Sequence, residues 1–73
     1  MEKYKYFLDD LVGLLKEKLE NAHEDMLLKN TNSSKDRVFA FYETLDLIKS
    51  QAKVFGIPLS EIGLNNYNIE KFL

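Results

Sequence analysis

The chain of 73 residues contains no cysteine and no tryptophan, and it has one histidine, one proline and three glycines. Without cysteine it can form neither a disulfide nor a thiolate metal site. Three isolated glycines make no Gly-rich loop for phosphate binding. The chain has one histidine and no cysteine, and it is too short to enclose a large pocket. The sequence therefore predicts a protein that is not an enzyme and that holds no cofactor or metal.

Long apolar runs and a strong excess of one charge are also missing. No stretch approaches the ~18 apolar residues of a membrane span, and the chain opens on no apolar run of signal-peptide length. We therefore expect a cytoplasmic protein without a membrane partner. Ten Lys and Arg against 12 Asp and Glu give a net charge of -2. Both signs are scattered along the chain, so a broad basic face for nucleic acid is not evident.

Apolar residues at helical spacing predict a first helix over about residues 3–29. Phe7 and Leu14 widen its apolar arc on one side and Val12 widens it on the other, so the arc covers close to half of the circumference. Gly13 lies nearly opposite the centre of this arc, where it is either a surface glycine or a point of close helix approach. The central stripe consists of Tyr4, Leu8, Leu11, Leu15, Leu19, Ala22 and Met26.

A polar run over residues 30–34 predicts a loop, because Ser, Thr and Asn side chains compete with helical backbone bonding. A short loop joins antiparallel neighbours. Ser33 or Ser34 is expected to cap a second helix over about residues 35–55. The sequence thus predicts a helical hairpin.

The second helix should end at Gly56-Ile57-Pro58. Glycine suits the left-handed position after a helix, Ile57 can fold back on the last turn, and proline cannot continue the helix. Residues 56–73 then form a tail with two further turns, one at 59–62 closed by Gly63 and one capped by Asn68. The tail is rich enough in apolar residues that it should pack against the hairpin.

The second helix is more apolar than so small a protein needs. One face carries a stripe at helical spacing, and a second stripe repeats every seven residues along another flank. One short partner helix cannot cover both stripes, which favours self-association or a bound partner. The first stripe consists of Val38, Phe41, Leu45, Ile48, Ala52 and Phe55, and the second of Ala40, Leu47 and Val54.

The predicted interface joins the second stripe to the widened arc of the first helix. Phe39 is added because it lies on the far side of the second helix, where it either contacts a partner or is partly buried under the tail. The predicted interface residues are Ala40, Leu47, Val54, Phe39, Phe7 and Leu14.

These observations predict one all-α domain over residues 1–73: an antiparallel helical hairpin with a short, partly helical C-terminal tail, dimerising into a four-helix bundle. A chain of this length buries too little surface to be very stable alone, and dimerisation would compensate. In architecture, though not in sequence, this resembles the Rop-type plasmid copy-number regulators, which are dimers of helical hairpins that bind RNA. The favoured function is a non-catalytic interaction or regulatory module whose partner is a second copy or another protein.

Two catalytic or metal-binding alternatives have partial motifs. Glu20 and His23 have the Glu-x-x-His spacing of di-metal helical bundles, but the helical wheel places both away from the centre of the apolar arc. Ser50-Gln51 resembles the start of the signature of small helical-hairpin phosphatases, which act on the aspartyl phosphates of response regulators. That signature has an Asp four residues after the Ser. Val54 occupies this position, so we expect no activity to follow from the resemblance.

Nucleic-acid binding is the main alternative function. It would use four lysines on the exterior of the bundle, namely Lys16, Lys18, Lys49 and Lys53. Acidic residues are interspersed among them, which weakens the case for a basic surface.

Overall fold

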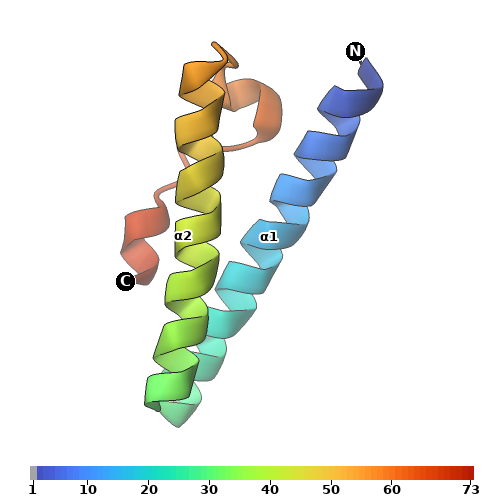
Figure 1. Cartoon of the computed structure of the whole chain (residues 1–73). Coiled ribbons are helices and arrows are strands. Elements are labelled where there is room, and N and C mark those ends of the chain that lie inside the picture. The colour runs from blue at the N-terminus through green and yellow to red at the C-terminus, as the bar shows by residue number, and fades with distance from the viewer. Residues whose placement is uncertain (1) are drawn as a thin grey trace.

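The computed structural model describes residues 2–73, which form two long helices and two short 3-10 helices. Figure 1 shows α1 and α2 antiparallel, close together at their connecting loop and diverging toward the N-terminus of α1. η1 lies between the diverging ends, and η2 lies against α2. The predicted all-α hairpin with a packed tail is confirmed. The elements are α1 (Glu2–Lys29), α2 (Asn32–Val54), η1 (Leu59–Ile62) and η2 (Ile69–Phe72).

The loop between the long helices is shorter than the predicted 30–34 segment and consists of Asn30 and Thr31. Asn30 follows α1 with a left-handed backbone, φ 50°. The Thr31 side chain accepts a hydrogen bond from the Ser34 N–H, and the Thr31 N–H donates to Ser34 Oγ at 3.0 Å. The prediction that Ser33 or Ser34 caps the second helix is therefore wrong. Thr31 is the cap, Ser34 is its reciprocal partner in a capping box, and the helix begins about one turn before residue 35.

α2 ends in the geometry that its sequence predicts. Gly56 is left-handed with φ 67°, and its N–H donates to the Lys53 carbonyl at 3.2 Å. The Ile57 N–H donates to the Ala52 carbonyl at 2.8 Å. These two bonds make a Schellman motif, which turns the chain back toward α1.

The tail forms both turns expected of it. Gly63 closes η1 with a left-handed backbone, φ 73°, and the Leu64 N–H donates to the Leu59 carbonyl at 3.0 Å. Asn68 caps η2 by accepting a hydrogen bond from the Glu70 N–H at 3.2 Å. Both turns are too short to be stable alone, so the apolar residues that they carry must hold them in place.

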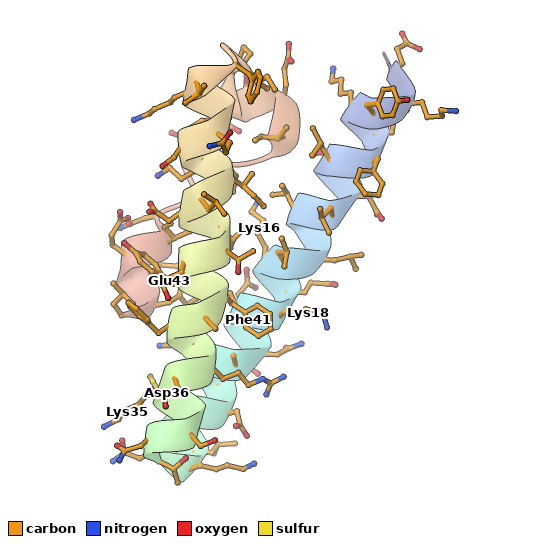
Figure 2. The ribbon with its side chains drawn as sticks, in the orientation of Figure 1. Lys16, Lys18, Lys35, Asp36, Phe41 and Glu43 are labelled. Carbon is orange, nitrogen blue, oxygen red and sulfur yellow. The ribbon has the colours of Figure 1, made fainter. Side chains whose placement is uncertain are left out.

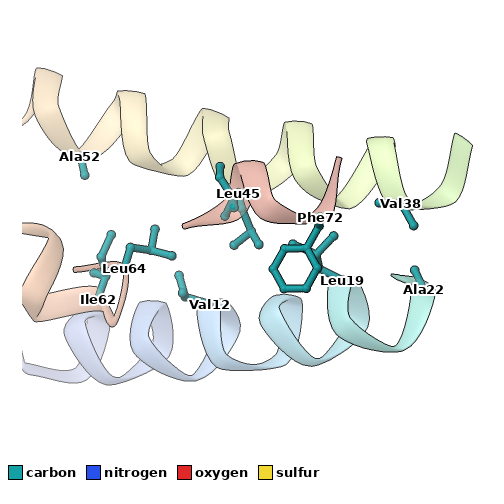
Figure 3. Packing of buried hydrophobic residues seen from close by; sticks show 10 residues of the cluster. Val12, Leu19, Ala22, Val38, Leu45, Ala52, Ile62, Leu64 and Phe72 are labelled. Carbon is teal, nitrogen blue, oxygen red and sulfur yellow. The ribbon is translucent and has the colours of Figure 1, made fainter. Parts of the chain in front are cut away.

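The core has three contributors, because the tail fills the space that two helices leave (Figure 3). Phe72 projects between α1 and α2 near Leu19, while Ile62 and Leu64 occupy the diverging end. Because the tail residues are as buried as the helical ones, tail and hairpin share one core. The buried apolar residues are Val12, Leu19, Ala22, Val38, Leu45, Ala52, Ile62, Leu64, Ile69 and Phe72.

Three residues expected in the core stripes lie outside the core, namely Tyr4, Leu11 and Phe55. Phe55 and Tyr4 are mostly exposed, at 73% and 62%. Both lie at the end where α1 and α2 diverge, so neither helix can cover the terminal turn of the other.

Gly13 lies in an open environment, since a Cβ placed there would meet no atom within 4 Å. Gly13 is a surface glycine and no point of close helix approach.

Polar contacts of Tyr67 and Gly63 with Lys16 and Glu20 connect the tail to α1, and we call this group of contacts the clasp. Lys16 Nζ donates a hydrogen bond to the Gly63 carbonyl and lies 4.4 Å from the centre of the Tyr67 ring. The Tyr67 hydroxyl donates to Glu20 Oε2 at 2.8 Å, and Lys71 Nζ lies 5.8 Å from the same ring. Tyr67 is therefore held by a carboxylate at its hydroxyl and by ammonium groups at its ring.

The clasp makes stability depend on pH in the alkaline range. Burial, followed by the hydrogen bond to Glu20, raises the pKa of Tyr67 above its ordinary value. The folded protein therefore holds the phenol proton more tightly than the unfolded chain does. This contribution to stability is complete below pH ~10, and it is lost as the pH rises through the raised pKa of the folded state.

We expect Tyr67→Phe to lower the free energy of unfolding by about 1 kcal/mol or less at pH 7, because one hydrogen bond is lost. Above pH ~10 the variant should lose less stability than the native protein does, because it lacks the phenol. Urea unfolding at pH 7 and pH 11 measures both effects. Tyr6→Phe is the control, since Tyr6 is 66% exposed. Equal declines in the native and Tyr67→Phe proteins would contradict the assignment.

Candidate interaction surface

The tail covers one face of the hairpin and leaves the opposite face uncovered. On α1 the side chains that meet the tail are Lys16, Glu20 and His23. At 100° per residue, Phe7, Leu11 and Leu14 lie roughly 120–180° around the helix from these positions. In Figure 1 the tail passes behind α2, so the view looks onto the uncovered side. We call this side the open face and define it by Tyr4, Phe7, Leu11, Leu14, Ala40, Leu47, Val54 and Phe55.

Large apolar side chains are exposed on the open face. Phe7 is 64% exposed, Leu47 60% and Val54 73%. The whole chain exposes 5307 Å², whereas a compact monomer of this mass exposes about 4,700 Å². Scattered surface apolar residues are ordinary, but a continuous set on adjacent helices marks a binding surface.

An apolar hollow lies at the diverging end of the hairpin. Leu47 of α2 and Phe55, the residue that caps this helix, form one wall. Leu8 of α1 forms the other wall, and Ile57 and Ile62 of the tail complete the hollow. Its volume is about 300 Å³. Gln51 contributes the polar group at its edge. The hollow could receive an apolar side chain from a partner.

The open face is apolar toward the diverging end and polar toward the loop. On α1, Lys18 and Asp25 continue the positions of Phe7, Leu11 and Leu14, and on α2 Arg37 lies in the first turns. Figure 2 shows Phe41 in the seam between the helices on this side. The Arg37 guanidinium carbon lies 5.9 Å from the centre of the Phe41 ring. The two ends of the open face therefore offer different chemistry.

Five of the six predicted interface residues lie on the open face. The exception is Phe39, whose ring stacks on Tyr42 with 6.0 Å between ring centres. Phe39 also lines a hollow with Phe72 and Leu73. It therefore lies beside the tail, which was the second of its two predicted surroundings. Three residues that the sequence places in the core stripes lie on the open face instead, namely Tyr4, Leu11 and Phe55.

Comparisons with known protein families, with curated proteins and with solved structures find no match. The function must therefore be inferred from the surface itself.

Both members of the Glu-x-x-His pair contact the tail. Glu20 accepts the hydrogen bond from Tyr67, and the His23 ring meets the Phe72 ring edge-on with 5.3 Å between centres. His23 is half-buried, which corrects the prediction of a histidine facing away from the core. Within residues 2–73, no group of three or more His, Cys, Asp and Glu side chains is arranged to hold a metal ion.

The predicted basic surface is divided between two faces. Lys16 belongs to the clasp, and Lys49 is half-buried beside Leu59 and Tyr67 of the tail. Lys18 and Lys53 remain exposed. Ser50 is exposed on α2, and Gln51 lines the apolar hollow. In the described part of the chain, neither long helix has an apolar stretch sufficient to cross a membrane.

Proposed function

We propose that this chain is a non-catalytic interaction module that acts as a homodimer, in which the open faces of two hairpins meet to form a four-helix bundle. The observation that supports this proposal is the set of large apolar side chains exposed on the same side of both helices. Apolar and aromatic side chains of this kind form the centres of protein interfaces.

The size of the open face favours a second hairpin as its occupant. The molecule measures 42 × 20 × 18 Å, so the rectangle that encloses its broad side has an area of ~840 Å². Specific interfaces bury about 800 Å² per partner. A single helix about 10 Å wide would cover only the seam or one of the two stripes, whereas a second hairpin covers both. A second copy of this chain is such a hairpin.

Nucleic-acid binding has less support. Of the four lysines that would carry it, Lys16 and Lys49 are occupied with the tail. The exposed pair, Lys18 and Lys53, lies on different helices among acidic residues. A salt-titrated binding assay against mixed RNA and DNA distinguishes this alternative, since phosphate contacts give a steep loss of affinity with salt.

Sedimentation equilibrium over a range of micromolar concentrations tests the homodimer. The expected mass is twice the 8.5 kDa of the chain. Dilution should lower both the mass and the thermal stability, because the folded state is stabilised by association. A folded monomer whose stability does not change with concentration would contradict the proposal.

A further inference from the structure

We infer that the two hairpins of the dimer run in the same direction, with their loops at the same end, so that α1 of each protomer packs on α2 of its partner. This orientation rests on the proposed homodimer. It follows from where apolar and charged residues occur along the open face.

The heights of residues along the hairpin are fixed by its loop. Because α1 and α2 are antiparallel and joined at Asn30 and Thr31, residues whose numbers add up to about 61 lie at the same height. Figure 3 shows this for Ala22 and Val38, which lie opposite one another. Phe7 is thus level with Val54, Leu14 with Leu47, and Asn21 with Ala40. The seven-residue repeats of the two helices are in register.

A two-fold axis parallel to the hairpin makes use of this register. Such an axis places α1 of one protomer over α2 of the other and keeps all residues at their heights. Phe7 then meets the partner's Val54, and Leu14 meets the partner's Leu47. The apolar hollow at the diverging end faces the same apolar half of the second copy. In the half of the bundle toward the diverging end, the apolar surface of each protomer is therefore covered by apolar surface of the other.

Charges on the polar half match in the same orientation. Lys18 is level with the partner's Glu43, which lines the surface of α2 beside Ala40 and Leu47. Asp25, which pairs with Lys29 of its own helix at 3.2 Å, is level with the partner's Arg37 within one residue. Figure 2 shows Lys18 and Glu43 on different helices of one protomer. Opposite charges at equal height favour this pairing and disfavour shifted ones.

The opposite orientation brings unlike surfaces together. An axis across the hairpin places α1 on the partner's α1 with the direction reversed. Phe7 would then meet the partner's Asp25, and Leu14 would meet the partner's Lys18. Burying those charges against apolar side chains is costly.

A staggered version of that opposite orientation would overlap only the apolar halves. It covers about half of the open face, or ~400 Å² per protomer, which is well below the ~800 Å² of a specific interface. Full overlap with the loops at the same end is the arrangement that covers the whole open face and also brings opposite charges to the same height.

Distances between two spin labels test the orientation. The chain has no cysteine, so Ser33→Cys and Ser60→Cys each introduce one labelling site. Both serines are exposed, Ser33 near the loop and Ser60 in η1 at the diverging end. We expect short distances between protomers at both sites, well below the 42 Å length of the molecule. Distances near or above 42 Å at both sites would indicate that the hairpins overlap fully in the opposite orientation. A short distance at Ser60→Cys alone would indicate the staggered arrangement. Either result would overturn the inference.

A charge exchange provides a second measurement. Lys18→Glu and Glu43→Lys should each raise the dimer dissociation constant about tenfold, and the double variant should restore it to within about threefold. Lys53→Glu makes the same change in net charge away from the open face and should have little effect. A double variant that is no tighter than the single variants would overturn the inference. A monomeric native protein with no coupling between labels would instead reject the homodimer itself.

Discussion

Replacing Leu47 with Glu is expected to convert the protein from a dimer to a monomer of 8.5 kDa. Leu47 lies near the mid-height of the hairpin, at the inner end of the apolar half of the open face, where it lines the hollow beside Ile48 and Phe55. In the dimer a carboxylate at this position would be buried without a partner, and the two-fold symmetry introduces it twice. An uncompensated buried charge costs roughly 3 kcal/mol or more, which raises the dissociation constant more than a hundredfold.

The matched control is Leu27→Glu. Leu27 is 67% exposed, close to the 60% of Leu47, but it lies on α1 outside the open face. Sedimentation should therefore report a dimer for Leu27→Glu and a monomer for Leu47→Glu, while circular dichroism reports how much helix each keeps. If Leu47→Glu remains dimeric at the native dissociation constant, the open face is not the interface.

The sequence predicts the ends of helices well where the signal is local. Gly56 and Pro58 act through their own backbone restrictions, so the end of α2 follows from those residues alone. The start of α2 was missed although it is also local. Thr31 and Ser34 exchange hydrogen bonds in a capping box, and a run of polar residues offers several positions from which such a pair can be formed.

Positions that depend on distant contacts could not be predicted. Phe55 continues the apolar stripe of the second helix, yet it is exposed because the helices diverge at its height. Phe39 lies beside Phe72 and Leu73, whose place depends on the path of the tail. A helical wheel gives the direction of a side chain but not what lies opposite it. The angle between α1 and α2 and the position of η2 result from packing.

The seven-residue stripe of the second helix predicts apolar surface that the hairpin itself leaves exposed. Ala40, Leu47 and Val54 were assigned to an interface because one neighbouring helix cannot cover two stripes. In the structure, α1 and the tail cover the first stripe up to Ala52, and Leu47 and Val54 stay exposed. The surplus of apolar surface in the sequence thus corresponds to the open face, and the tail does not remove it.

Ile69→Ala is expected to lower the free energy of unfolding by about 2–4 kcal/mol, the usual cost of removing a large buried aliphatic side chain. Ile69 is fully buried, with 0% of its surface exposed, although it lies in a 3-10 helix of four residues. η2 contacts both long helices, so the cavity would lie in the shared core. Since small domains have only about 5–15 kcal/mol of stability, this loss would be a large fraction of the total.

Leu73→Ala is the control for Ile69→Ala, because the neighbouring Leu73 side chain is 66% exposed and should contribute less than about 0.5 kcal/mol. Urea unfolding of both variants at one fixed protein concentration separates the core effect from mass action on the dimer. Amide hydrogen exchange should show protection lost together in the tail and in α2, because they share one core. If Ile69→Ala instead frees the tail amides while the helices keep their protection, and the free energy changes by less than about 1 kcal/mol, the hairpin is stable without its tail.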